Sequence, residues 1–307
     1  MKNFINLKDI PASDLRKILK DAKKRKIKRK KFNTIQIDKD NPLNGKLLIQ
    51  MFEKSSTRTR LSFYLAIRQL GGGILTLRTD ELHLAKGESL PDTARILSTY
   101  GNAFMLRTDS DEKLKEFKKY ISIPIINGLS PSSHPTQILS DVFTIEEIKK
   151  KNISKLNICW IGDSNNVLNS LIEASVKFSF KLKIGCPKKY NPNKYLMTWA
   201  KNNKGNIKIF NDPKKAIINS DVVLTDKVIS MNDKVNKQKK KKEFKNFKIT
   251  SKLMKLAPKA CFLHCLPRGK EVSDEVFYGN KSKVWQQALN RVYVQKSILL
   301  YCFDKLR

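Results

Sequence analysis

The sequence predicts an α/β protein built from two parallel-sheet units, and three observations lead to this prediction. The chain has 307 residues, more than one hydrophobic core usually organises. Hydrophobic residues make up 40% of it and aromatic residues 8%, which supplies two cores and excludes a disordered or collagen-like chain. Short apolar runs alternate with helical patterns along the chain, as in parallel α/β sheets.

The first half begins with a predicted helix, with Ser13 as N-cap and an apolar face of Leu15, Ile18, Leu19 and Ala22. Four strand-like runs follow, and each is succeeded by polar residues and a helical stretch. They span residues 47–52, 74–77, 103–106 and 123–126. Parallel strands joined through helices are the arrangement that this order favours.

The second half repeats the alternation with five strand-like runs. They span residues 156–161, 182–185, 208–210, 222–224 and 261–263. A lysine-rich stretch near residues 147–154 is the expected border, which gives a first domain at 1–148 and a second at 149–284. No run of about 18 apolar residues is present to span a bilayer, and residues 1–15 have no apolar signal-peptide core. We therefore expect a cytoplasmic protein.

The formal net charge of +34 raises the possibility of a nucleic-acid-binding protein. The excess is mostly lysine dispersed along the chain, without a zinc-finger spacing, an RNP motif or an arginine-rich helix. An A/T-biased genome produces the same lysine-rich composition, so we expect only weak attraction to polyanions. The runs KKRKIKRKK, residues 23–31, and KQKKKK, residues 237–242, are interpreted as solvated surface or mobile loop.

The five cysteines are an odd number and form no CxxC pair, which argues against a disulfide framework and a zinc ribbon. Reduced thiols are expected. Among the three histidines only His264, in CFLHC, stands beside cysteines. A tetrahedral metal site needs further ligands that no nearby spacing supplies, so no metal is expected.

In open α/β sheets ligands bind beyond the carboxyl ends of the strands, and the residues after several predicted strands are chemically reactive. Ser56, Thr57, Arg58 and Thr59 follow the first run at a predicted helix N-terminus, where free N–H groups, hydroxyls and a guanidinium suit a phosphate. The alternative is a helix cap followed by solvated arginines.

A second segment, His134, Pro135, Thr136 and Gln137, opens a predicted helix with proline at its first position. His134 and Gln137 are able to donate to an oxygen that develops negative charge. A capping turn is the alternative interpretation. Arg107 directly follows another strand, and the convergence of all three segments favours a phosphate site.

The second half of the chain has a different set of candidate ligand-binding residues after its predicted strands. The turn GDSNN, residues 162–166, lacks the glycines of a dinucleotide-binding GxGxxG motif, so NAD is not expected. Asn166 suits a zwitterion or caps a turn, and Asp226 suits a substrate ammonium or is an ordinary loop carboxylate. Cys265 follows a buried strand and is either a core residue or part of the site. A free thiol has a pKa of about 8.5, and a nucleophilic cysteine needs a cationic neighbour to lower that value.

The segments SSTRTR, HPTQ, TDKVISM and HCLP, in this order, resemble the signature set of the ornithine carbamoyltransferases. The resemblance extends over nearly the whole chain, including KGESLPDTARILSTY, GDSNNVLNSLIEAS and NRVYVQKSIL. STRTR and HPxQ are shared with aspartate carbamoyltransferases, whereas the SM and HCLP elements favour ornithine. The start, NLKDIPASDLRKIL, is similar to the bacterial, particularly the alphaproteobacterial, branch.

The resemblance implies two doubly wound domains, of which the first binds carbamoyl phosphate and the second L-ornithine. It also implies a last helix, within residues 285–307, that packs back on the first domain. Members form homotrimers or multiples of trimers and need no metal or organic cofactor. The implied activity is carbamoyl transfer to the side-chain amine of ornithine, giving citrulline and phosphate, in the direction of arginine biosynthesis.

Site roles follow from the resemblance, motif by motif. The catalytic set is Cys265, Asp226, Arg107 and His134. Carbamoyl phosphate is assigned to Ser56, Thr57, Arg58, Thr59, His83, Arg107, His134, Pro135, Thr136, Gln137, Cys265, Leu266 and Arg291. Ornithine is assigned to Asn166, Asp226, Ser230 and Met231.

The chain departs from the family pattern at several positions. His83 replaces a usual Gln, Val228 a Trp, Asn232 a Gly and Leu289 a Glu. The loop after HCLP is also shorter, which is similar to the LPR of the aspartate enzymes. Acylated ornithine, putrescine and aspartate therefore stay open as acceptors, a basic nucleic-acid-binding protein stays a distant alternative, and catabolic use of the reaction employs the same groups.

Overall fold

The computed structural model describes residues 2–29, 34–78, 87–229 and 236–306. The chain separates into two compact units, Met1–Ser140 with Leu289–Arg307, and Asp141–Ala288. These borders fall inside helices α5 (Pro135–Lys149) and α12 (Val284–Cys302), whereas the borders proposed from the sequence lie at 148/149 and 284/285. Among the residues that the structure describes, no helix has the length and apolar character needed to cross a membrane.

The first unit is built on a parallel sheet of four strands in the order β2-β1-β3-β4. All four predicted runs are strands: β1 (Leu47–Phe52), β2 (Gly73–Arg78), β3 (Ala103–Arg107) and β4 (Ile125–Leu129). The last begins at Ile125 rather than at residue 123, because Pro124 has no N–H to give to the ladder.

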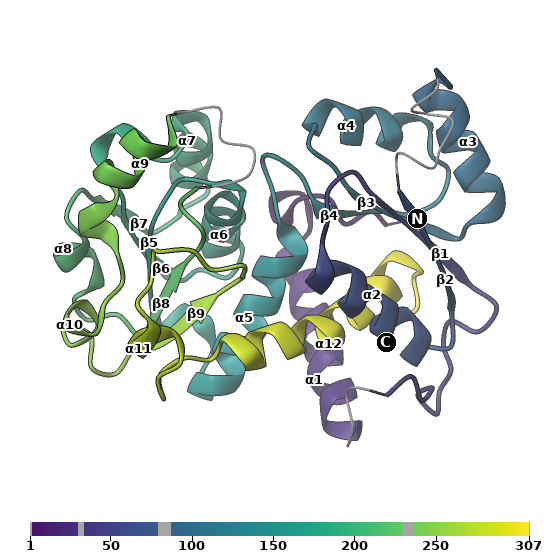
Figure 1. The fold of residues 1–307 in the computed structure, drawn as a ribbon. Coiled ribbons are helices and arrows are strands. Elements are labelled where there is room, and N and C mark those ends of the chain that lie inside the picture. The colour runs from purple at the N-terminus through teal and green to yellow at the C-terminus, as the bar shows by residue number, and fades with distance from the viewer. Residues whose placement is uncertain (1, 30–33, 79–86, 230–235, 307) are drawn as a thin grey trace. The chain divides into compact units, whose positions relative to one another are not determined.

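Helices cover both faces of this sheet (Figure 1). Its helices are α1 (Ala12–Lys28), α2 (Thr57–Gln69), α3 (Leu90–Tyr100) and α4 (Asp111–Tyr120), preceded by a short 3-10 helix, η1 (Leu7–Asp9). Helices α3 and α4 bury an apolar core against one face, including Leu97, Phe104 and Phe117. Helices α1 and α2 and the end of α12 lie on the other face.

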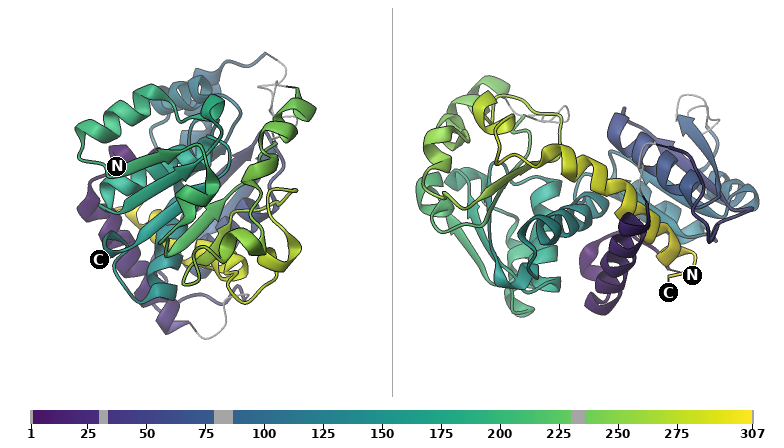
Figure 2. Two further views of the ribbon diagram at one scale, coloured as in Figure 1. Left: turned by 90° about the vertical axis from the view of Figure 1, so that its left-hand side faces the viewer. Right: turned by 90° about the horizontal axis from the view of Figure 1, so that it is seen from below.

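The last helix packs on the first unit, as predicted. Lys26 of α1 donates to Asn290 at 2.7 Å, and Ser297 of α12 donates to Asp21 at 2.6 Å. Near the two ends of the chain Lys2 Nζ lies 3.1 Å from Asp304 Oδ1, and Figure 2 shows the yellow end of α12 beside the purple α1. The structure therefore confirms that residues far apart in sequence complete one layer of the first unit.

The predicted apolar face of α1 is confirmed, but its predicted cap is wrong. Leu15 and Ile18 are fully buried, as the periodicity requires. The helix begins at Ala12 with Pro11 at the N-cap, so Ser13 lies inside the first turn. The Pro11 carbonyl accepts from the N–H groups of Asp14 and Leu15, and proline's fixed φ prepares the chain for this start.

Most described residues of the two lysine-rich runs are exposed, as the solvated-surface interpretation expects, but they lie in helices rather than in loops, and some of their basic side chains are paired. In the first, Arg25 and Arg29 are partly buried and bind Asp21, Asp38 and Asp40. The second run forms helix α9 (Lys237–Glu243). Charged side chains are buried only when they are paired, and composition alone does not reveal the acidic partners.

The second unit is built on a five-stranded parallel sheet in the order β7-β6-β5-β8-β9. The strands are β5 (Asn157–Ile161), β6 (Lys181–Gly185), β7 (Ile207–Phe210), β8 (Val222–Thr225) and β9 (Cys261–His264). Besides α9, its helices are α6 (Asn166–Lys177), α7 (Lys194–Asn202), α8 (Pro213–Ile217), α10 (Ser251–Met254) and α11 (Asp274–Phe277), with 3-10 turns η4 (Ile153–Lys155), η5 (Lys188–Tyr190) and η6 (Lys245–Phe247).

Both sheets are doubly wound, so each has a point at which the strand order reverses. In the first sheet this point lies beside β1 and β3, and in the second beside β5 and β8. The crevice outside the carboxyl ends of the strands at such a point is where open α/β sheets bind ligands. The topology therefore selects the loops after these strands as candidate sites.

Candidate active site

The loop after β1 leads into α2 through a capped helix start. Ser56 is the N-cap, and its hydroxyl accepts from the Thr59 N–H at 3.4 Å. Thr57 and Arg58 are the first two residues of the helix, so their N–H groups have no partner within it. This end of α2 combines backbone donors, hydroxyls and a guanidinium, as the sequence predicted.

The HPTQ segment follows β4 and opens α5, with Pro135 as its first residue. His134, Thr136 and Gln137 are all buried. The preceding loop is held by Asp111, whose carboxylate accepts from the hydroxyls of Ser130 at 2.6 Å and Ser132 at 2.7 Å. The first residue of α4 thus fixes the loop that carries His134.

Arg291 of α12 connects the first turns of α2 and α5. Its side chain donates to Gln137 Oε1 at 2.7 Å and to Thr59 Oγ1 at 2.8 Å, and the residue is 2% exposed. Three candidate residues from distant parts of the sequence therefore meet in the first unit.

The electrostatic surroundings of His134 are those of an anion site. Burial lowers the pKa of His134 well below its usual value, and the positive charges of Arg291, Arg107 and Arg58 lower it further. The imidazole is therefore neutral at pH 7 and acts as a hydrogen-bond donor or acceptor rather than as a cation. Arg107 ends β3, beside the point where the strand order of the first sheet reverses.

In the second unit Asp226 directly follows β8. Its Oδ1 accepts from the thiol of Cys265 at 2.9 Å, and its Oδ2 accepts from the amide of Asn165 at 2.8 Å. The predicted pair of Asp226 and Cys265 is thus in contact. The thiol donates a hydrogen bond to a carboxylate. This arrangement suits a hydrogen-bond donor rather than a nucleophilic thiolate.

The turn after β5 is formed by residues that the sequence only partly assigned. Gly162 has φ +153, and a Cβ there would lie 3.0 Å from Thr225 Oγ1. Asn165 is the N-cap of α6 and accepts from the N–H groups of Val167 and Leu168. Asn166 is the first residue of that helix. The capping role, weighed above for Asn166, therefore belongs to Asn165.

Sequence reasoning missed the pair formed by His264 and Glu271. His264 Nε2 lies 3.0 Å from Glu271 Oε1, and its Nδ1 accepts from the Leu266 N–H at 2.9 Å. The N–H donated to Nδ1 places the ring proton on Nε2. Burial by itself raises the pKa of Glu271, but hydrogen bonds from His264 and from the Gly269 N–H outweigh it and lower that pKa.

This pair holds the backbone on either side of Cys265. Leu266 has φ +60 and precedes a cis peptide bond to Pro267, and its N–H is fixed by His264. The HCLP motif is the sequence signal for this pair, because its histidine directly precedes the thiol of Cys265.

Asp226, His264 and Cys265 have ligand-type atoms within 4.8 Å of one another. Their hydrogen bonds do not suit a metal ion, because both ring nitrogens of His264 and the thiol proton are already engaged. A structural or catalytic metal needs three or more available ligands.

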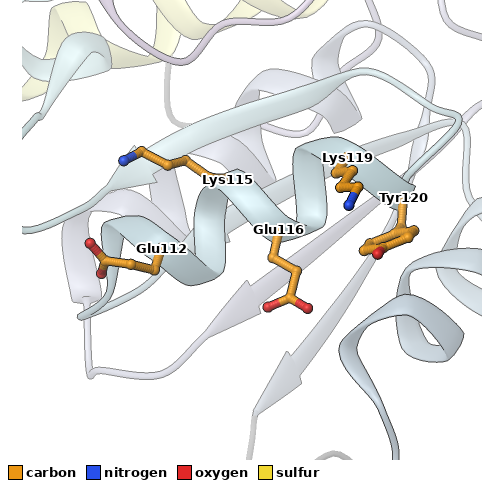
Figure 3. A pocket seen from close by; sticks show the side chains of 5 residues that line it. All are labelled: Glu112, Lys115, Glu116, Lys119 and Tyr120. Carbon is orange, nitrogen blue, oxygen red and sulfur yellow. The ribbon is translucent and has the colours of Figure 1, made fainter.

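Three predicted site residues, His83, Ser230 and Met231, lie outside the described residues. A shallow hollow of about 340 Å³ is lined by Glu112, Lys115, Glu116, Lys119 and Tyr120. Figure 3 shows that all of these side chains project from α4. It contains no residue of the predicted site, and its side chains are of mixed charge.

The chain matches two family models along nearly its whole length. Residues 2–147 match the carbamoyl-P binding domain of the aspartate/ornithine carbamoyltransferases, and residues 154–302 match their Asp/Orn binding domain. The ornithine carbamoyltransferase of Brucella suis is 41% identical, over 99% of this chain and 96% of its own. That of Rhodopseudomonas palustris is 42% identical, over 98% and 96%.

Solved structures give the same result. The ornithine carbamoyltransferase from Pyrococcus furiosus superposes with a TM-score of 0.90 at 37% identity, covering 97% of this chain and 96% of that one. The anabolic ornithine carbamoyltransferase from Campylobacter jejuni also superposes with a TM-score of 0.90, at 36% identity, covering 99% of this chain and 100% of that one.

Proposed function

The chain belongs to the aspartate/ornithine carbamoyltransferase family, and on this premise we propose that it carbamoylates the side-chain amine of L-ornithine. The products are L-citrulline and phosphate. The chain is thus an enzyme, a carbamoyltransferase with ornithine as its acceptor. The anabolic relative from Campylobacter jejuni supports the biosynthetic direction, toward arginine.

The observation that carries the donor half of the proposal is the surroundings of His134. Arg58, Arg107 and Arg291 all act on this buried, neutral imidazole. Carbamoyl phosphate has a phosphate that needs cations and a carbonyl that needs donors. Guanidinium groups suit the first, and a neutral imidazole N–H and the Gln137 amide suit the second. Ser56, Thr57 and Thr59 add the hydroxyls and N–H groups of a helix start.

The acceptor half rests on Asp226. Its carboxylate follows β8 and already accepts hydrogen bonds from Cys265 and Asn165, so the same oxygen atoms are able to bind a substrate ammonium or amine. Asn166, Ser230 and Met231 complete the proposed ornithine set, whereas Leu266, next to Cys265, belongs to the proposed carbamoyl phosphate set.

The reaction proceeds by direct attack of the neutral amine on the carbamoyl carbon. The new C–N bond forms, and the carbonyl oxygen becomes negative in a tetrahedral intermediate stabilised by Arg58, Arg107 and His134. The C–O bond to phosphate then breaks, and phosphate leaves with the electron pair. Asp226, with the thiol of Cys265 beside it, orients the amine and accepts its proton. Positioning and electrostatic stabilisation supply most of the rate.

The assembly, location and cofactor requirement are part of the same proposal. The family resemblance supports a homotrimer, or a multiple of trimers, in the cytoplasm. It also supports a reaction without a metal or organic cofactor. Light scattering of the purified chain tests the assembly, and a molar mass that is not a multiple of three chains would contradict it.

An acceptor panel tests the proposed function. The purified chain is given carbamoyl phosphate with L-ornithine, an acylated ornithine, putrescine or L-aspartate, and phosphate release is measured in parallel with the carbamoylated product. We expect ornithine to have the highest kcat/KM. A preference for aspartate would place the chain in the other branch of the family, and no turnover with any of the four would contradict the proposal.

A further inference from the structure

Lys240 differs from the other lysines of its run, KQKKKK. It is 3% exposed, whereas its neighbours Lys239 and Lys241 are exposed. Its ammonium lies 2.6 Å from Asp163 Oδ2, in the turn that follows β5. A buried ammonium is costly unless it is paired. The run therefore contains one lysine with a specific partner.

The rest of α9 also holds to this part of the second unit (Figure 1). The Tyr190 hydroxyl donates to the Glu243 carboxylate. The ring of Tyr190 lies 4.8 Å from that of Phe244 and 5.5 Å from the Lys240 ammonium. Three contacts thus fix the direction from which Lys240 reaches Asp163.

Asp163 in turn fixes the backbone of its own loop. Its Oδ1 accepts from the Ser164 N–H at 2.9 Å, and its carbonyl accepts from the Trp160 indole at 3.1 Å. Asn165, which follows Ser164, caps α6, and its side-chain amide donates to Asp226 at 2.8 Å. A continuous series of contacts therefore leads from Lys240 to the carboxylate assigned to the acceptor amine.

We propose that Lys240 is a positioning residue for the acceptor site, acting through Asp163 and Asn165 on Asp226. This inference rests on the proposed function, because it assigns Asp226 to ornithine. Lys240 balances the charge of Asp163 and so keeps the turn after β5 in the conformation that directs Asn165 at Asp226. Without Lys240, a carboxylate with 14% exposure has lost the cation bound at its Oδ2, and the turn moves to bring it to water.

The test compares Lys240→Met with Lys239→Met and Lys241→Met, which remove the same charge from exposed positions of α9. Methionine keeps the apolar stem of Lys240 beside Tyr190. For Lys240→Met we expect the KM for ornithine to rise about tenfold, equivalent to roughly 1.4 kcal/mol, while the KM for carbamoyl phosphate stays at the wild-type value. Both control variants keep wild-type values.

The double variant Asp163→Asn/Lys240→Met separates positioning from general loss of stability. The asparagine oxygen still accepts from Ser164, and no carboxylate is left without a cation. We expect the double variant to recover most of the ornithine KM. If Lys240→Met does not fold, the double variant takes its place, and an ornithine KM close to wild type supports the inference.

Three results would overturn the inference. The first is a KM for ornithine that is the same in Lys240→Met and Lys239→Met, and the second is an equal rise in the KM values for ornithine and carbamoyl phosphate in Lys240→Met. The third is a double variant whose KM for ornithine does not return toward the wild-type value. Each of them is measured as a ratio to an active wild-type enzyme. A wild-type enzyme that forms no citrulline would instead contradict the proposed function, so the two failures are distinguishable.

Discussion

Arg58 and Arg60 lie two residues apart at the start of α2 and therefore face different surroundings. Burial lowers the pKa of His134, and the charge of Arg58 contributes to the same effect. Arg60 is exposed and lies over the Phe52 ring, 5.6 Å from its centre. One arginine of the STRTR motif is therefore expected to bind a ligand, and the other to cover surface.

We predict that Arg58→Ala weakens carbamoyl phosphate binding by about 2–5 kcal/mol, the cost of removing one partner of a desolvated charged pair. The thermal unfolding midpoint stays close to wild type, because Arg58 does not belong to a core. Calorimetric titration with carbamoyl phosphate measures the loss, with Arg60→Ala as the matched control. Unchanged affinity in folded Arg58→Ala would place the phosphate elsewhere.

The thiol of Cys265 donates a hydrogen bond to Asp226. We therefore expect Cys265 to orient the amine of ornithine rather than to attack the carbamoyl carbon. Cys265→Ala should lower kcat and raise the KM for ornithine yet leave measurable turnover. Its rate should still rise with pH as the ammonium of ornithine loses its proton, since only the neutral amine attacks. Steady-state kinetics across pH 6–9 check this, and complete loss of turnover would contradict it.

The residues that sequence reasoning located share one property: they belong to motifs that directly follow strands. Arg58, His134 and Gln137 are of this kind. Arg291 came only from the family resemblance, because a helix interior carries no positional signal. Asn165 could not be distinguished from Asn166, since both have the same capping chemistry and only the backbone decides which of them precedes α6.

At the scale of elements, α1 and α12 are joined by a buried ionic cluster in the first unit. Asp38 accepts from Arg25 at 3.0 Å, from Arg29 at 2.8 Å and from Lys296 at 2.6 Å. Lys296, on α12, has a fully buried side chain. Burial lowers its pKa to about 8; Asp38 opposes this shift, and the nearby arginines add to it.

This cluster predicts a specific pH dependence of stability. Between pH 8 and the ordinary lysine value of 10.5, the unfolded chain binds more protons at Lys296 than the folded chain does. The free energy of unfolding contributed by this group therefore rises with pH across that window, by on the order of 2–3 kcal/mol. Below pH 8 the lysine is charged in both states, and its contribution is constant.

Urea unfolding at pH 7.5 and pH 10 measures this effect as the difference between wild type and Lys296→Met. Lysines that titrate equally in both states cancel in that difference. Lys20→Met, at an exposed position of α1, serves as control and should follow wild type. A stability difference between wild type and Lys296→Met that is the same at both pH values would contradict the prediction.

Strands were easier to predict than helices for a physical reason. Strands such as β1 and β5 are mostly apolar, with one polar residue each, because a parallel sheet is covered on both faces. Helix α9 has no apolar period in its lysine run, and contacts such as Lys240 with Asp163 hold it in place. Such tertiary contacts override local composition.

At the scale of the whole molecule, the net charge of +34 needs an explanation other than function. Ion pairs such as those of Arg25 and Lys240 leave this sum unchanged, because their acidic partners are already counted in it. The catalytic candidates each lie at or after the carboxyl end of a strand of their own unit, while the lysines are dispersed along the chain. The charge is therefore expected to attract polyanions without selecting among them.

We predict that binding to DNA or RNA is weak, independent of sequence and steeply dependent on salt, because it consists only of counterion release. Fluorescence anisotropy with unrelated oligonucleotides, from 50 to 200 mM salt, is the measurement, and the affinity should fall by a similar factor for all of them. Tight, sequence-selective binding that persists at 150 mM salt would require a second function.

The two-unit fold could be predicted almost completely from the alternation of apolar runs and helical stretches. What the sequence did not define was the exact border, because α5 and α12 each run through it without a break in periodicity. Continuous helices give no loop, glycine or proline to mark where one unit ends.

We propose direct transfer of the carbamoyl group to the side-chain amine of ornithine. It is tested most directly with ¹³C-labelled carbamoyl phosphate and ornithine labelled with ¹⁵N at the side chain, with NMR of the product and rapid-quench mass analysis of the protein. Burial raises the pKa of Cys159 to about 12 and of Cys186 to about 11, and Cys261 and Cys302 are also buried, so Cys265 is the thiol most accessible to label.

We predict citrulline with a direct ¹³C–¹⁵N bond, formed in equal amount to phosphate, and no carbamoyl label on the protein at any time. Label on Cys265 before product appears would replace direct attack with a covalent mechanism. Phosphate release without a ¹³C–¹⁵N bond would contradict transfer to ornithine altogether.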